Sequence, residues 1–229
     1  MRALLPHLAL VSTLGCGSAA YTYSGYWASN HFPIEDNWVW EYTNEGEDFL
    51  LRAETTNREA SGATEIVTID YSNRETGNLL YSIKWSSDKT DGIQVHGYYV
   101  AEPFSGSDDD GDGDGEDTGG SVDVTIGEWV LFNPPLALAD RQAEAGDTLS
   151  TSTGGVAYES YFEAYEDCPN LYATDWRCMK VTITSDDDGA APFEGTWHWA
   201  AEYGTSLFQP AGNDFPWKLV GEPRWTEAN

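Results

Sequence analysis

The sequence predicts an all-β protein with minor helix content, folded as a single domain. Apolar and polar residues alternate with a period of two in several short runs, and clusters of Gly, Asn, Asp and Pro separate these runs. The 10 Trp, 13 Tyr and 8 Phe supply ample apolar surface for a core. Removal of residues 1–15 from the 229 leaves 214, a length at which one sandwich or barrel is still a single domain. Together these observations favour a meander, a sandwich or a barrel.

The N-terminus has the layout of an export signal, in which one Arg precedes an apolar stretch and small residues follow. Cys16 stands directly after Gly15 at the end of that stretch, which is similar to the lipobox of bacterial lipoproteins. Thr13 and Leu14 depart from that pattern, which usually has Leu and then a small residue at these places. Cleavage after Ala20 is the alternative. We therefore predict a signal peptide at 1–15, lipidation of Cys16, a tether at 16–30 and a β-rich domain at 31–226.

A lipid anchor implies a location in the cell envelope, with the membrane as a partner. No later segment has the roughly 20 apolar residues that a membrane-spanning helix needs. Gly17 follows the cysteine where an Asp commonly retains lipoproteins in the inner membrane, so the outer membrane is favoured. A periplasmic or secreted protein is the alternative.

The chain is strongly acidic, with 11 basic and 39 acidic side chains and a formal net charge of −28. The field of such a chain opposes the phosphates of nucleic acids, which excludes them as partners. Solubility in high salt accounts for this balance, and capture of cations is the competing interpretation.

Cys168 and Cys178 form an even pair in a compartment where disulfides persist. The segment between them contains Pro169, Asn170 and Asp175 and can turn back on itself. A metal site is the alternative, but no His lies nearby and zinc takes four ligands. A disulfide is the prediction.

Period-two alternation begins at Trp38, Trp40 and Tyr42, which share one face of an expected strand. Residues 156–167 fit both a strand and a helix, and we favour the strand; residues 136–145 are expected to form a short helix. The segments expected as strands are 38–42, 49–55, 65–71, 79–85, 93–100, 122–132, 176–184, 197–203 and 217–220.

Residues 105–120 are rich in Asp and Gly and offer nothing to a core, which predicts a flexible acidic insertion. Asp110, Asp112 and Asp114 resemble the opening of a calcium loop. Ser121 stands where an EF-hand has its Glu, so the match ends there. Calcium binding is the alternative to a merely flexible insertion, and no other cofactor is expected. A second acidic cluster, 186–188, is expected to be a hairpin turn.

No motif for catalysis is present, whether a zinc-protease, nucleophile-elbow, phosphate-loop or dinucleotide pattern. His31, His96 and His198 stand apart from one another in the sequence. Carboxylates are so abundant that no pair of them identifies a glycosidase. We therefore expect a protein that is not an enzyme, with an undetected hydrolase as a lesser alternative.

Five tryptophans stand at two-residue spacing on three separate strands. If those strands are neighbours, their indoles gather on one concave face and line a cleft for an apolar or aromatic ligand. A filled core is the competing interpretation. The residues of this predicted site are Trp38, Trp40, Trp85, Trp197 and Trp199.

The segment H-F-P-I-x-x-N-W-V-W-E-Y, residues 31–42, resembles the start of a group of uncharacterised bacterial lipoproteins. Pro134 to Leu136 with Gly146 and Asp147, and the strand around Cys178, resemble the middle and later parts of that group. The resemblance implies a curved antiparallel sheet or half-open barrel, as in periplasmic lipoprotein carriers, and brings no catalytic residues. Its implication is structural, since a fold does not determine a function. Our first hypothesis for the function is a non-enzymatic envelope lipoprotein that binds an apolar ligand or a protein partner in a sheet cleft. A structural or interaction lipoprotein without a ligand is the alternative.

Overall fold

A computed structural model of the chain describes residues 28–34, 37–101, 126–169, 177–187, 191–201 and 203–225. These residues form one antiparallel sheet of thirteen strands and a single 3-10 helical turn. In chain order the elements are η1 (Ala28–Asn30), β1 (Trp38–Thr43), β2 (Leu51–Ser61), β3 (Thr64–Asn73), β4 (Leu79–Asp88), β5 (Gly92–Val100), β6 (Trp129–Ala139), β7 (Thr148–Thr153), β8 (Val156–Asp167), β9 (Arg177–Ser185), β10 (Gly195–Ala200), β11 (Gly204–Pro210), β12 (Trp217–Leu219) and β13 (Arg224–Trp225).

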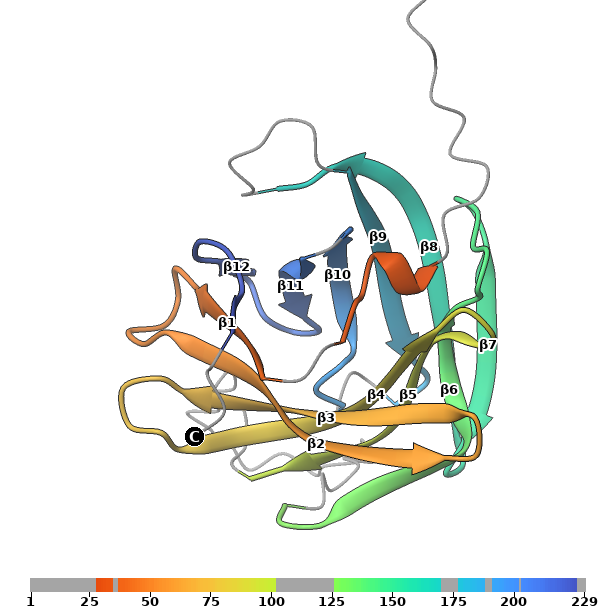
Figure 1. Ribbon diagram of the computed structural model, residues 1–229, viewed down its shortest axis with the longest axis horizontal. Helices are drawn as coiled ribbons and strands as arrows, with labels where there is room; N and C mark the ends of the chain where they lie inside the picture. The colour runs from red at the N-terminus through yellow and green to blue at the C-terminus, as the bar shows by residue number, and fades with distance from the viewer. Residues whose placement is uncertain are drawn as a thin grey trace, which may run out of the picture.

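Twelve of the strands form a nearly closed up-and-down barrel (Figure 1). Strands β1–β6 pair consecutively as one meander and β7–β12 as a second, and β1 joins the two by pairing with β12. The one seam lies between β6 and β7, where the Asn133 amide donates to Thr153 Oγ1 at 3.1 Å. The all-β prediction is confirmed, and the sheet closes further than the half-open barrel implied by the resemblance.

The predicted short helix at 136–145 is wrong. Leu136 and Leu138 are buried in alternation on β6, and Leu136 pairs with Val95 of the neighbouring strand. The strand ends at Ala139 and a turn follows. The sheet therefore supplies hydrogen-bond partners to an apolar run that is too short to form a stable helix by itself.

Residues 156–167, whose sequence fits both a strand and a helix, form the strand β8 as predicted. Its pairing with β9 shifts between Phe162 and Ala164, so a bulge interrupts the alternation. This shift explains why the aromatic residues of β8 also match a helical spacing. Strand β7 was not predicted, because its sequence TLSTST holds a single large apolar residue.

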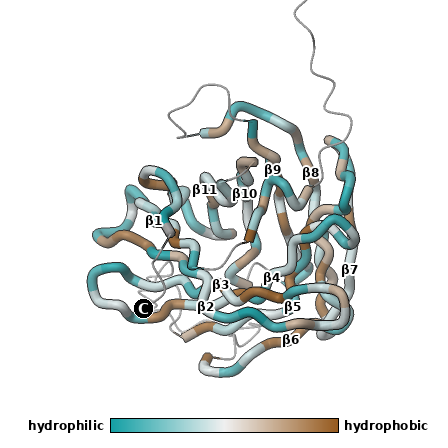
Figure 2. Tube along the Cα trace, viewed as in Figure 1, coloured by the Kyte–Doolittle hydropathy of each residue, from teal (hydrophilic) through white to brown (hydrophobic). Residues whose placement is uncertain are grey.

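Hydrophobic and hydrophilic residues alternate along the strands, as Figure 2 shows, and the inward positions are filled by aromatic side chains. The side chains of Trp40, Trp85, Trp197, Trp199 and Trp217 are at most 2% exposed. Trp85 of β4 lies 5.6 Å from Trp197 of β10, between ring centroids. Because β4 and β10 stand on opposite walls, this contact shows that the walls meet across the interior.

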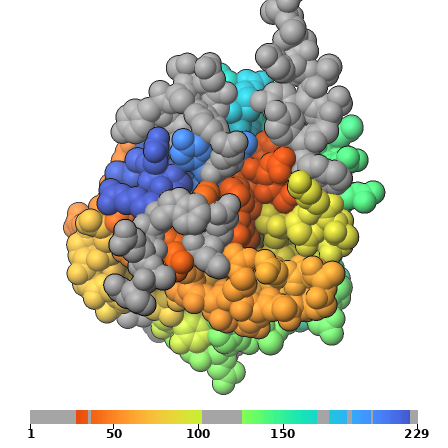
Figure 3. Space-filling model, viewed as in Figure 1, coloured from red at the N-terminus to blue at the C-terminus, as the bar shows by residue number. Residues whose placement is uncertain are grey.

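Residues 28–34, which we call the N-terminal plug, run inside the ring of strands (Figure 1). The Phe32 ring is 1% exposed and lies 4.9 Å from the Trp85 ring and 5.5 Å from the Trp199 ring. The Ala28 amide donates to the Arg141 carbonyl at 3.0 Å. In Figure 3 the red-orange atoms of this part of the chain lie between yellow residues of the first meander and blue residues of the second. Ala28, assigned to the tether from the sequence, is thus buried against the barrel.

Candidate functional site

The five tryptophans predicted to line a cleft all point into the barrel. Trp85, Trp197 and Trp199 form one cluster, with ring centroids 5.6–6.4 Å apart. Trp38 and Trp40 form another pair at 5.5 Å. The most exposed of the five, Trp38, is only 8% exposed. Ligand binding by these residues stays a prediction, and in this structure the plug residue Phe32 occupies the place beside Trp85 and Trp199.

Two of these indoles also make hydrogen bonds that tie the chain together. Trp197 Nε1 donates to the Phe193 carbonyl and Trp40 Nε1 to the Tyr203 carbonyl, each at 2.7 Å. Such bonds let a buried Trp satisfy its only polar group. They are typical of core residues that hold strands and loops in register.

Buried tyrosines continue the core at the junction of the two meanders. The Tyr71 and Tyr81 rings stack with centroids 4.4 Å apart, and Tyr42 Oη donates to the Thr205 carbonyl at 3.1 Å. Burial raises the pKa of Tyr42, Tyr71 and Tyr81 above the ordinary phenol value. All three are therefore neutral at physiological pH and serve as packing groups.

An open groove of about 370 Å³ lies on the outer face of β2–β6, away from the aromatic core. Trp129 forms one end, with its side chain 39% exposed and its ring 5.8 Å from that of Tyr99. The full lining comprises Thr56, Asn57, Glu59, Thr68, Asp70, Leu79, Ser82, Lys84, Tyr99 and Trp129.

The floor of this groove is polar and its groups are bonded to one another. Lys84 Nζ contacts Glu59 Oε1 at 3.0 Å and lies 4.9 Å above the Trp129 ring. Ser82 Oγ donates to Asp70 Oδ1 at 2.6 Å. One wall is therefore aromatic, and the floor presents carboxylates, a hydroxyl and an ammonium group.

The groove arises because outward positions of five adjacent strands face the same side. Lys84 points outward between the buried Ile83 and Trp85, as strand alternation requires. A bulge in β2 helps to shape it: Thr55 pairs with Ile69 and Asn57 with Thr68, so Thr56 is the extra residue. Bulges bend a strand and redirect side chains. Here the bulge places Thr56 and Asn57 in the groove and also in an adjoining hollow of about 200 Å³.

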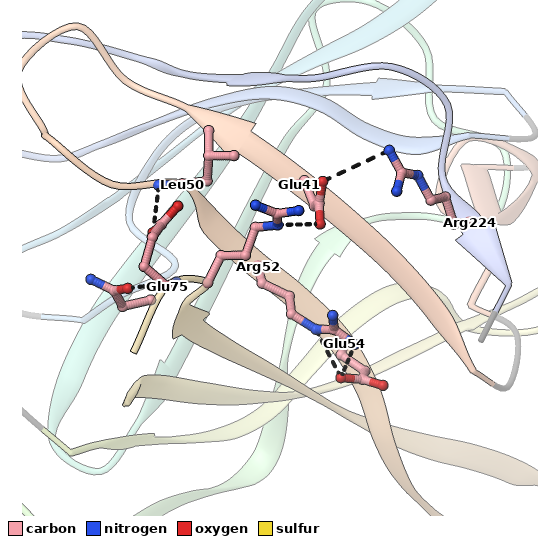
Figure 4. A network of polar contacts seen from close by, with 8 residues as sticks. Glu41, Leu50, Arg52, Glu54, Glu75 and Arg224 are labelled. Atoms are coloured by element: carbon pink, nitrogen blue, oxygen red, sulfur yellow. Dashed lines mark hydrogen bonds and ion pairs between the residues drawn. The ribbon is translucent and has the colours of Figure 1, made fainter. Parts of the chain in front are cut away.

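Ion pairs cover the neighbouring outer face of β1 and β2 (Figure 4). Arg74 Nε lies 2.7 Å from Glu41, and Arg52 lies 2.8 Å from Glu54 on the same strand. Arg224 approaches Glu41 at 4.0 Å. These pairs are partly exposed and each contributes about 0–1 kcal/mol. The arginines on this face are therefore paired with carboxylates.

The three histidines that stand apart from one another in the sequence each have a close neighbour in the fold. His198 Nε2 lies 2.8 Å from Glu166 and His96 Nε2 lies 2.8 Å from Ser86 Oγ, while the His31 ring lies 5.2 Å from the Tyr165 ring. Burial lowers the pKa of His198 and of His96. Neither lies in the groove. His96 is hydrogen-bonded to a serine, Ser86, but that residue is fully buried, so a substrate cannot reach its hydroxyl in this structure.

Glu194 is the carboxyl group that most resembles a functional acid, because it is 2% exposed and burial raises its pKa. It accepts hydrogen bonds from Ser185 Oγ at 2.8 Å and from the Ala191 amide at 3.2 Å. These bonds hold the connection between β9 and β10.

The predicted disulfide between Cys168 and Cys178 is confirmed, and it links the end of β8 to the start of β9. Cys16, residues 105–120 and the three candidate calcium ligands Asp110, Asp112 and Asp114 lie outside the described residues. Among the residues that the structure does describe, no group of three or more His, Cys, Asp or Glu could hold a metal ion.

Sequence reasoning did not find the groove. Most of its residues fall within segments that we expected to be strands, such as 65–71 and 79–85, but none of them was singled out from the sequence. Trp129 is the one signal that could have found it, because Trp129 and Leu131 are exposed at alternate positions of β6, on the face opposite Phe132. A large apolar residue on an outward position is a better indicator of a binding surface than one facing the core.

Within the described ranges no helix has the length and apolar character needed to cross a membrane. Comparison with known proteins finds no matching family model, no matching curated protein and no matching solved structure. What is shown is the architecture: an all-β, nearly closed antiparallel barrel with an aromatic core and a groove on its outer face.

Proposed function

We propose that this chain is a non-enzymatic binding protein of the cell envelope. It is held to a membrane by lipid at Cys16 and contacts its ligand or partner through the groove on the outer face of β2–β6. One observation carries the proposal: the interior aromatic residues pack against one another and against Phe32, whereas Trp129 is 39% exposed beside a groove of about 370 Å³. An exposed aromatic group next to convergent polar groups offers a ligand both an apolar contact and hydrogen-bond partners.

Among the residues that the structure describes, the tryptophans of the barrel interior have no comparable exposed surface. Trp85, Trp197 and Trp199 contact each other across the barrel and are at most 1% exposed. A ligand could reach them only by displacing the plug, which would break the contacts of Phe32 and the hydrogen bond from the Ala28 amide. The outer groove needs no such rearrangement.

The groove favours binding over catalysis. Its lining contains no His and no Cys, so the Asp70 and Glu59 carboxylates are its candidates for acid–base or nucleophilic work. The Asp70 carboxylate accepts a hydrogen bond from Ser82, and Glu59 is paired with Lys84.

A structural surface lipoprotein without any ligand is the second candidate, since a filled core alone suffices for that role.

Native mass spectrometry of the protein released from its own membrane in mild detergent tests the proposal. We expect an acylated N-terminus and a retained ligand mass on the unmodified protein. Trp129→Ala should lose the ligand mass and keep the acyl mass. The matched control is Tyr161→Ala, which removes an aromatic side chain that is 42% exposed on β8, outside the groove.

Cys16→Ser should lose the acyl mass and move the protein from the detergent phase to the aqueous phase. Unchanged partition of this variant would contradict the lipid anchor. If no protein retains a ligand mass, or if Trp129→Ala retains the same mass as the unmodified chain, binding in the groove is contradicted. The structural lipoprotein without a ligand is then the remaining candidate.

A further inference from the structure

The residues of the groove also identify a class of ligand, and this inference rests on the function proposed above. We propose that the groove binds a neutral polyhydroxylated chain, that is, an uncharged oligosaccharide or polysaccharide segment. The juxtaposition that carries it is an aromatic wall, Trp129 and Tyr99, beside a floor of paired hydroxyl, amide, carboxylate and ammonium groups.

A sugar ring has an apolar face of C–H groups and an edge of hydroxyl groups. An aromatic ring has an electron-rich face that attracts polarised C–H groups, so Trp129 and Tyr99 suit the face of the sugar. Hydroxyl groups are both donors and acceptors, and they need both kinds of partner. Asp70 and Glu59 supply acceptors, Lys84 supplies donors, and Asn57 supplies both.

The charge pattern selects a neutral ligand. Lys84 is the only basic residue in the lining and is paired with Glu59, which leaves the Asp70 carboxylate in excess. Arg58, next to the groove on β2, is paired with Glu65. With a chain charge of −28, an anionic polymer is repelled. A cationic ligand would have to compete with Lys84 for the Glu59 carboxylate.

The lining also argues against a lipid or another apolar ligand. Seven of its ten residues carry polar or charged side chains, and only Leu79, Tyr99 and Trp129 are carbon-rich. An apolar ligand would leave the hydroxyl, amide and carboxylate groups without partners and lose affinity.

The shape fits a chain better than a compact molecule. The lining residues come from five consecutive strands, β2 to β6, and neighbouring strands lie about 4.8 Å apart. The groove therefore crosses the strands over roughly 19 Å. The groove is open rather than enclosed, which suits a polymer segment that does not have to thread an end.

Affinity electrophoresis of the intact folded chain tests the inference. Native gels contain one neutral polysaccharide each (dextran, hydroxyethyl cellulose, xylan or galactomannan), and a gel with alginate supplies an anionic polymer. We expect at least one neutral polysaccharide to retard the protein and alginate not to do so. Trp129→Ala should weaken that binding by about tenfold, because it removes the stacking surface. Asp70→Asn should weaken it as well, with the thermal transition retained.

Tyr161→Ala is again the control and should bind like the unmodified chain. Equal loss in Tyr161→Ala and Trp129→Ala, retardation by alginate alone, or no retardation by any neutral polymer would overturn the carbohydrate inference. The two proposals fail separately. Native mass spectrometry could show a ligand that Trp129→Ala loses but that contains no sugar, such as a basic peptide. That result would refute the carbohydrate inference and leave binding in the groove intact. Absence of any Trp129-dependent ligand in both experiments refutes both.

Discussion

Phe32 is the residue whose removal most directly tests how the barrel interior is filled. Its ring is 1% exposed and packs between Trp85 of one meander and Trp199 of the other. Phe32→Ala removes the transfer free energy of an aromatic side chain, about 2–3 kcal/mol. It also leaves a cavity, which adds about 1–2 kcal/mol because the surrounding rings relax only in part. The expected loss of stability is therefore about 3–5 kcal/mol.

For a domain of this size, a loss of about 4 kcal/mol lowers Tm by roughly 10 °C. Thermal unfolding followed by near-UV circular dichroism measures this shift. Phe215→Ala is the matched control: the same side chain is 43% exposed there, and its removal should change stability by no more than about 0.5 kcal/mol.

The same variant has a second readout that stability alone does not give. The cavity of Phe32→Ala is lined by Trp85 and Trp199, so it should bind a small apolar molecule such as benzene with a change in Trp emission. The unmodified protein should not. Equal Tm losses in Phe32→Ala and Phe215→Ala, with no benzene binding, would refute the assignment of residues 28–34 as a plug.

Three further predictions follow from the covalent link, the acidic insertion and the buried histidine. Replacement of Cys168 and Cys178 by Ser should lower stability by about 2–3 kcal/mol, measured by urea unfolding; no change would mean that the link adds nothing to the fold. Deletion of 106–119 should leave a cooperative thermal transition near that of the intact chain, and a calcium-dependent shift confined to the intact chain would instead identify a metal site. Burial holds the pKa of His198 below its unfolded value of about 6.5, although Glu166 opposes this effect. The unfolded state therefore binds the proton first, and stability falls as pH drops below that value. His198→Gln should lose less stability than the unmodified chain between pH 7.5 and 5.5, and parallel pH profiles would contradict this.

The sequence was a good guide to local structure because alternation is a local property. Trp38, Trp40 and Tyr42 share a face in β1, as predicted, and β8 is a strand despite its second, helical spacing. The disulfide could also be predicted, because Cys168 and Cys178 are the two cysteines that remain once Cys16 is assigned to lipid, and disulfides persist in the expected compartment. Errors arose where a neighbour decides the outcome: Leu136 is in a strand because β5 lies beside it, and β7 is a strand because β8 pairs with it.

Closure of the sheet could not be predicted, because it depends on contacts between distant parts of the chain. Tyr42 of β1 pairs with Leu219 of β12, and the tyrosine hydroxyl reaches the Thr205 carbonyl. No local pattern encodes such a pairing. The same holds for the plug: His31 to Ile34 precede the first strand and carry no periodicity that would send Phe32 into the barrel.

Closure also changes where a binding surface can lie. A sheet that stayed half open would have exposed Trp85 and Trp199 on its concave face, and these residues would then have been the natural ligand site. Because β1 joins β12 and the plug fills the remaining space, the inward face becomes core. Among the strand residues that the structure describes, the outward positions are then the ones that can contact another molecule. Trp129 is exposed there beside a groove with convergent polar groups, whereas the exposed Tyr161 and Phe215 do not line that groove, which is why we place recognition on the outer face of β2–β6.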